Sequence, residues 1–164
     1  FAQEDVEQLA EHAEIPVING LTDYAHPCQA LADLMTIREK LGRLSGARLA
    51  YLGDGNNVCV SLMVGAARFG MRFVAATPEG YEPDPTAVSA ARRAAVQMGG
   101  TVELVRDPRE AAREARRRER EKRSVKKEPK PSRRMDIIDQ LDTTTIFGTG
   151  RTCRVSPPLS SVPD

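Results

Sequence analysis

The chain has 164 residues, of which 40% are hydrophobic, 29% charged and 4% aromatic, and its formal net charge is +1. This is room for one globular domain with or without a tail, and the small net charge implies no special partner. The chain has three widely spaced cysteines and two histidines, which argues against a disulfide framework and a structural zinc site. It has no apolar run long enough to span a membrane. We therefore expect a cytoplasmic protein with reduced thiols.

The net charge hides three stretches of different character. Residues 1–105 carry 8 Lys or Arg and 13 Asp or Glu, residues 106–134 carry 14 and 6, and residues 135–164 carry 2 and 4. Their net charges are therefore −5, +8 and −2. A shift of this kind often marks a boundary, so we predict that an ordered domain ends near residue 115.

The first forty residues predict two helices with an extended segment between them. Residues 3–13 place apolar side chains on one helical face. Residues 15–18 are a short apolar run, which we interpret as a buried strand end. A second helix begins at Pro27, keeps an apolar spacing as far as Leu41 and ends at Gly42.

Strands and helices then alternate with short connections. In chain order, the predicted strands and helices are residues 47–52, 58–69, 71–76, 85–98 and 101–105. A further helix is expected to open after residue 107. This alternation predicts an α/β fold, an open parallel sheet with helices on both faces.

The alternation stops after about residue 115. Residues 143–164 are rich in Thr, Ser, Pro and Gly, so we predict that residues 116–164 are a disordered tail. Only residues 135–141 have a short amphipathic pattern. The basic run 113–134 has interleaved acidic residues and no aromatic side chain, so we expect no nucleic-acid binding. An interaction protein that acts through this basic tail is an alternative function.

The first candidate site is His-Pro-Cys-Gln, residues 26–29, at the start of a predicted helix. A helix N-terminus attracts anions, and His26 and Gln29, one turn apart, would face the same ligand. The imidazole can donate a hydrogen bond to a carbonyl or phosphate oxygen. The structural alternative, which the spacing alone favours, is that His26 caps a loop and Gln29 is solvated. Cys28 and Cys59 have no assignable His partner and are predicted to be small buried hydrophobes.

The second candidate site is the loop Gly-Asp-Gly-Asn-Asn, residues 53–57, between a strand and a helix. Open parallel sheets bind ligands at such loops. The dinucleotide fingerprint requires a third glycine where Val58 stands, although Glu79 is near the position of its acidic residue, so a Rossmann-type nucleotide-binding module is a second alternative. The adjacent Asn56 and Asn57 favour a small polar ligand, and a tight turn is the structural alternative.

Four runs of the sequence occur together in one order. They are IPVINGLTD (15–23), HPCQALADLMTI (26–37), YLGDGNN (51–57) and AATPEGYEPD (75–84). Together they resemble the ornithine carbamoyltransferase family of the aspartate/ornithine carbamoyltransferase superfamily. The His-Pro-x-Gln helix is shared with the aspartate branch, whereas the Gly-Asp-Gly-Asn-Asn loop is similar to the ornithine branch. The resemblance covers residues 1 to about 115 and leaves the tail unmatched.

The resemblance implies a reaction and a role for each motif. Carbamoyl phosphate and L-ornithine would give L-citrulline and phosphate by attack of the δ-amine on the carbamoyl carbon, with no metal, cofactor or covalent intermediate. His26, Pro27, Cys28 and Gln29 would contact carbamoyl phosphate, and the His26 imidazole would polarise the carbamoyl carbonyl. Asn57 would contact ornithine. Most of the rate would come from holding the two substrates in line.

The resemblance also implies an organisation. Residues 1–24 would end a carbamoyl-phosphate lobe, residues 25–42 would be a connecting helix, residues 43–115 would begin an ornithine lobe and residues 116–164 would be the tail. The family is homotrimeric and serves arginine biosynthesis or the urea cycle. The family's phosphate-binding loop and its later ornithine-binding segments have no counterpart in this sequence. We therefore expect an internal fragment that is inactive alone.

Overall fold

The computed structural model describes residues 1–116. Their elements, in chain order, are α1 (Gln3–His12), α2 (Pro27–Leu41), β1 (Arg48–Leu52), α3 (Asn57–Arg68), β2 (Arg72–Ala76), α4 (Pro85–Met98), β3 (Thr101–Val105) and α5 (Pro108–Arg116). Within these residues no helix is long and apolar enough to cross a membrane. The predictions of a disordered tail, of an amphipathic pattern at residues 135–141 and for most of the basic run lie outside the described residues.

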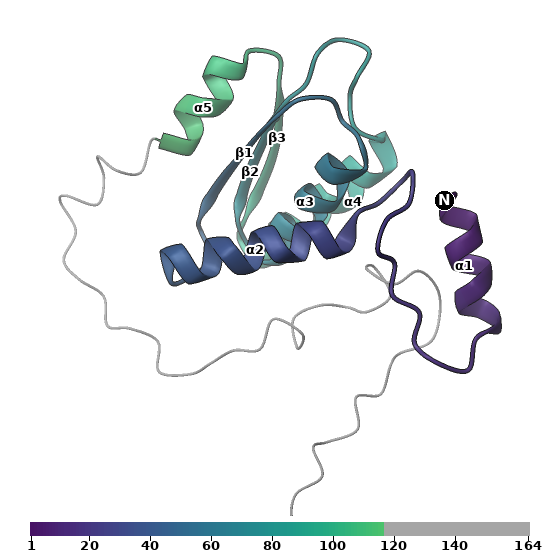
Figure 1. Ribbon diagram of the computed structural model, residues 1–164. Helices are drawn as coiled ribbons and strands as arrows, with labels where there is room; N and C mark the ends of the chain where they lie inside the picture. The colour runs from purple at the N-terminus through teal and green to yellow at the C-terminus, as the bar shows by residue number, and fades with distance from the viewer. Residues whose placement is uncertain (117–164) are drawn as a thin grey trace, which may run out of the picture.

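The three strands form one parallel sheet in the order β1-β2-β3, as the alternation predicted (Figure 1). Arg48 lies opposite Arg72, which lies opposite Thr101. Helix α3 begins one residue earlier than predicted because Asn56 caps it. Helices α2 and α4 end where predicted, at Gly42 and Gly99, each of which adopts the left-handed conformation that suits glycine.

Helices cover both faces of the sheet, which confirms the predicted architecture. Side chains of β2 alternate, so Phe73 and Ala75 join the core made with α3 and α4, whereas Val74 and Ala76 pack with Ala111 of α5 on the other face. Helix α2 packs on α3 rather than on the sheet (Figure 1). Most core side chains are aliphatic, but the largest fully buried one is Phe73.

The prediction of a buried strand end at residues 15–18 is wrong. The segment belongs to no strand, and Ile15 and Ile18 are 74% and 66% exposed. Helix α1 likewise has no buried residue. An apolar run becomes buried only if another element covers it, and within the part of the chain that the structure describes nothing does so here.

Candidate active site

The start of α2 holds His26 by its backbone rather than by its side chain. His26 is the N-cap residue of α2, but its ring makes no capping hydrogen bond. Its backbone N–H donates to Ser61 Oγ on α3 at 2.8 Å. The His26 Nδ1 atom is buried and has no hydrogen-bond partner among the described residues. Buried polar groups normally have a hydrogen-bond partner, so this unpartnered ring nitrogen is the unusual feature of the segment.

Cys28 and Gln29 lie on the exposed side of α2. The buried positions of this helix are Pro27, Ala30 and Leu34. Because that spacing turns Cys28 away from the core, the prediction that Cys28 is a buried hydrophobe is wrong, and its Sγ donates to Asn19 O at 3.4 Å. Gln29 Nε2 donates to Asp33 Oδ1 at 3.0 Å, one turn further along the same helix.

The two asparagines that follow β1 have different contacts. Asn56 Oδ1 accepts from the N–H groups of Val58 at 3.0 Å and Cys59 at 3.2 Å, so this side chain caps α3. Asn57 Nδ2 instead reaches across to Thr22 O at 2.6 Å. The cap occupies first-turn N–H groups that a pyrophosphate at this helix would need, which weighs against the nucleotide-binding alternative.

Burial raises the pKa values of two groups beside this loop, Cys59 and Tyr51. Cys59 is fully buried, which confirms its prediction, and burial raises the pKa of its thiol to about 12, with the charge of Asp54 adding to the effect. Burial also raises the pKa of Tyr51, and Cys59 and Asp54 add to it. The Tyr51 hydroxyl donates to Asn56 Oδ1 at 3.3 Å. Cys59 is therefore a thiol, not a thiolate nucleophile, near neutral pH.

The loop after β1 packs backbone against backbone on the loop after β2. The Gly55 N–H donates to Tyr81 O at 2.7 Å. A Cβ atom on Gly55 would lie 2.1 Å from Pro83 N and 2.4 Å from the carbonyl carbon of Glu82. Because neither contact is with a flexible side chain, only glycine fits at this position without a shift of one loop.

Two hydrogen bonds bring the segment before α2 against the first turns of α3. One joins Asn57 to Thr22, and the other joins Ser61 to His26. Asn57 and Ser61 are one turn apart and therefore share a face of α3. Thr22 is itself held in place, since it is 1% exposed and its hydroxyl donates to Gln3 Oε1 at 2.7 Å. The structure thus places the two predicted motifs next to each other.

Neither Thr22 nor Ser61 is among the candidate residues that the sequence predicts. Ser61 does carry a signal, because it is the one polar side chain in residues 58–67, which are otherwise apolar. A lone hydroxyl on a buried helix needs a hydrogen-bond partner. Thr22 carries no such signal, since Thr is common in exposed loops.

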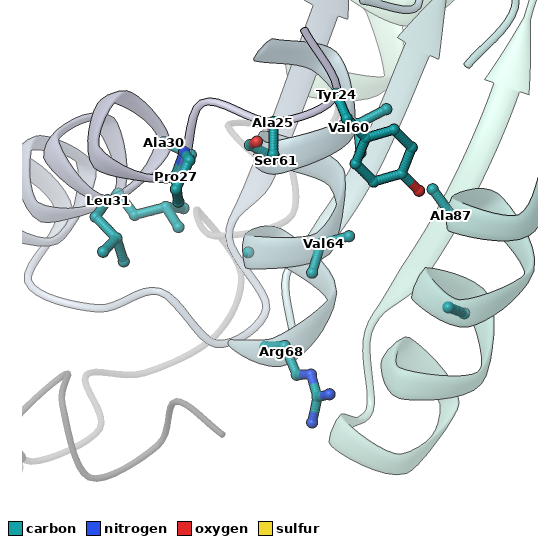
Figure 2. Close-up of a pocket in the computed structure, with 13 residues that line it drawn as sticks. Tyr24, Ala25, Pro27, Ala30, Leu31, Val60, Ser61, Val64, Arg68 and Ala87 are labelled. Atoms are coloured by element: carbon teal, nitrogen blue, oxygen red, sulfur yellow. The ribbon is translucent and has the colours of Figure 1, made fainter. Parts of the chain in front are cut away.

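A mostly apolar cavity of about 190 Å³ lies between α2, α3 and α4 (Figure 2). Its polar lining side chains are Tyr24, Ser61 and Arg68. The Tyr24 hydroxyl donates to Asp84 Oδ1 at 3.4 Å, at the start of α4. Because Ser61 lines this cavity, its contact with the His26 backbone lies at the cavity wall.

Two family models match the chain. The model described as "Aspartate/ornithine carbamoyltransferase, carbamoyl-P binding domain" matches residues 1–39. The model described as "Aspartate/ornithine carbamoyltransferase, Asp/Orn binding domain" matches residues 45–117. The candidate residues at the start of α2 fall in the first match, and Asn57 and Ser61 fall in the second.

Relatives with the same family name match the same part of the chain. The ornithine carbamoyltransferases of Thermococcus kodakarensis and Gloeobacter violaceus are 53% and 56% identical to it over 115 residues, which is 70% of this chain and 36% and 37% of theirs. The solved ornithine carbamoyltransferase from Pyrococcus furiosus has a TM-score of 0.67 and 46% identity, covering 74% of this chain and 44% of that one. The solved Gloeobacter violaceus structure has a TM-score of 0.67 and 55% identity, covering 68% and 39%. The chain thus spans little more than a third of the length of the curated relatives it matches.

Proposed function

The chain belongs to the aspartate/ornithine carbamoyltransferase family, because residues 1–39 and 45–117 match the two domain models of that family. We propose that it serves the formation of L-citrulline from carbamoyl phosphate and L-ornithine. The ornithine branch is supported by the Gly-Asp-Gly-Asn-Asn loop and by relatives of 51–58% identity that bear the name ornithine carbamoyltransferase. An anabolic role is supported by one such relative, from Pyrococcus furiosus, which is named anabolic.

In the proposed reaction the δ-amine of ornithine attacks the carbamoyl carbon. A C–N bond forms, the bond from that carbon to the phosphate oxygen breaks, and the proton that the amine loses goes to the departing phosphate, which leaves as hydrogen phosphate. Negative charge develops on the carbamoyl oxygen during the attack. A hydrogen bond from the His26 imidazole to that oxygen strengthens as the charge grows and so lowers the barrier.

The observation that carries this proposal is the state of His26. Its ring nitrogen Nδ1 is buried and unpartnered within residues 1–116, at the N-terminus of α2, where the first-turn N–H groups of Cys28 and Gln29 have no helical acceptor. A phosphate dianion is the ligand that such N–H groups favour. Gln29 would turn from Asp33 toward the ligand to complete the contact.

Asn57 supplies the proposed contact with ornithine. Its Nδ2 already donates to Thr22 O, so its Oδ1 is the atom that remains as an acceptor for an ammonium group of the amino acid. Because Asn57 opens the helix that also contacts the His26 backbone, the two substrates would meet between the starts of α2 and α3.

The test is citrulline formation by two proteins. One is the 164-residue chain, and the other is a chimera in which the Gloeobacter violaceus relative supplies the segments on either side of residues 1–115. We expect turnover in the chimera and none in the 164-residue chain. In the chimera, His26→Ala should lower kcat strongly while leaving a measurable rate, and the control Ser89→Ala, whose side chain is exposed on α4, should leave kcat unchanged.

A folded chimera without turnover would refute the proposed reaction, and binding of NAD would then be the next measurement, because a nucleotide-binding module is the alternative. Turnover in the 164-residue chain would refute only the proposal that it is inactive alone. A homotrimer and a cytoplasmic location are further proposals from family membership. Light scattering on the chimera tests the first, and localisation of the tagged chain in its own cells tests the second.

A further inference from the structure

We propose that Ser61 is a positioning residue for His26, because its hydroxyl oxygen accepts the His26 backbone N–H and so sets where the imidazole stands relative to Asn57. This inference rests on the proposed function, and Ser61 lies outside both candidate motifs, residues 26–29 and 53–57. Ser61 lies on α3, one turn after the second motif, and is not proposed as a substrate contact.

The hydrogen bond to Ser61 is short and satisfies the His26 N–H group. His26 N and Ser61 Oγ are 2.8 Å apart and join residues that are 35 positions apart in the chain. His26 is the N-cap residue, so its N–H does not take part in the helical ladder of α2. Without the Ser61 oxygen this half-buried donor would have to find another acceptor.

The backbone conformation of His26 also calls for a contact from outside the local sequence. The residue before a proline usually has ψ between about 120° and 160°. His26 precedes Pro27 and has φ −131° and ψ 65°. The local sequence therefore does not favour this backbone conformation. The hydrogen bond from the His26 N–H to Ser61 Oγ stabilises it instead. The ring itself makes no capping bond and its Nδ1 has no partner among the described residues, so the hydrogen bonds that hold His26 within them are those of its backbone.

Helix α3 fixes the distance between the two proposed substrate contacts. Asn57 and Ser61 are separated by one helical turn, so their Cβ atoms lie about 5–6 Å apart on one face. Asn57 holds Thr22 O at 2.6 Å while Ser61 holds the His26 N–H. Both ends of the short segment that enters α2 are therefore attached to the same rigid element. Ser61 thus determines the spacing from His26 to Asn57.

The surroundings of Ser61 allow the hydroxyl to be tested without repacking the core. Ser61 lines the cavity of about 190 Å³ between α2, α3 and α4 (Figure 2). The threonine in Ser61→Thr keeps the hydroxyl, and its added methyl group has this space to enter. The alanine in Ser61→Ala removes the oxygen alone. Ser89 on α4 is a matched control, because it is an exposed helical serine whose hydroxyl donates to Pro85 O within its own helix.

The first experiment measures amide hydrogen exchange of the 164-residue chain by NMR in the parent and in these three variants. We expect the His26 amide to exchange at least about tenfold faster in Ser61→Ala, and to remain protected in Ser61→Thr and Ser89→Ala, because exchange follows local opening. The amide of Phe73, in the central strand, should be unchanged throughout. Equal protection of His26 in Ser61→Ala would overturn the inference.

The second experiment is a double-mutant cycle in the chimera. If Ser61 acts through His26, Ser61→Ala lowers kcat between about 10-fold and 100-fold with little change in KM for carbamoyl phosphate, and Ser61→Thr restores most of the rate. In the His26→Ala background, Ser61→Ala then has no further effect on kcat, whereas a merely structural role gives additive losses and overturns the inference. Absence of turnover in the parent chimera would instead refute the proposed function, and the exchange experiment would still decide whether the hydrogen bond exists.

Discussion

Replacing Gly55 with alanine should destabilise the domain more than its size suggests. The new Cβ atom would lie 2.1 Å from Pro83 N, against at least 3.4 Å for an ordinary contact, so the two loops must separate by roughly 1.3 Å. Crowding of this kind costs about 1–3 kcal/mol, and loss of the hydrogen bond from Gly55 N to Tyr81 O costs about 0.5–1.5 kcal/mol more. We expect Gly55→Ala to lower the free energy of unfolding by about 2–4 kcal/mol, which is a large share of the 5–15 kcal/mol typical of a domain.

The assay is urea denaturation of the 164-residue chain, followed by circular dichroism, with thermal melting as a second measurement. The control is Gly20→Ala, because a Cβ atom on Gly20 meets nothing within 4 Å, and its effect should stay within about 0.5 kcal/mol. For Gly55→Ala the melting temperature should fall by at least about 8 °C. A change no larger than that of Gly20→Ala would refute the argument, since it would mean that the loops are not in backbone contact.

Three further predictions concern Asn56 and Cys59 at the start of α3 and Cys28 on α2. Asn56→Ala should lower the free energy of unfolding by about 1 kcal/mol, because the N–H groups of Val58 and Cys59 lose their acceptor. Asn56→Asp keeps an acceptor and should lower it much less. Equal losses of stability in urea denaturation would contradict the capping role. Burial raises the pKa of the Cys59 thiol from 9.0 to about 12, so the folded state holds this proton more tightly than the unfolded state. The contribution of Cys59 to the free energy of unfolding is therefore complete below pH 9 and is lost as the pH rises toward 12. Cys59→Ala should reduce that pH dependence, and iodoacetamide should label the exposed Cys28 in the native protein before Cys59; early labelling of Cys59 would contradict its burial.

The sequence predicts the sheet and its helices well because their signals are local. Each strand is a short apolar run, and α2 and α4 end at glycines that a continuing helix would disfavour. The errors arise where burial depends on distant partners. The run at residues 15–18 has the composition of a buried strand, yet the described part of the chain provides nothing to cover it.

The site was predictable in its motifs but not in its connections. The sequence identifies His26 and Asn57 as candidate residues, but it contains no information on which backbone group each motif contacts. Cys28 shows the same limit. Its neighbour Pro27 is buried and Cys28 is exposed, so an error of one residue in the helical face of α2 reverses the prediction. Ser61 could have been predicted from the sequence, because a single hydroxyl in an apolar helix needs a hydrogen-bond partner nearby.

The hydrogen bonds of Asn57 and Ser61 have a consequence for the order in which the domain folds. Each joins residues 35 positions apart, whereas the neighbouring strands pair residues 24 and 29 positions apart, such as Arg48 with Arg72 and Arg72 with Thr101. Doubling a loop costs only about 0.6 kcal/mol of conformational entropy, so loop length alone does not set the order, but both bonds require α3 to be formed first because their partners lie on one face of it. We therefore expect the sheet and α3 to assemble before the segment that carries His26 docks. Mutations at this docking contact should accelerate unfolding while leaving the folding rate nearly unchanged.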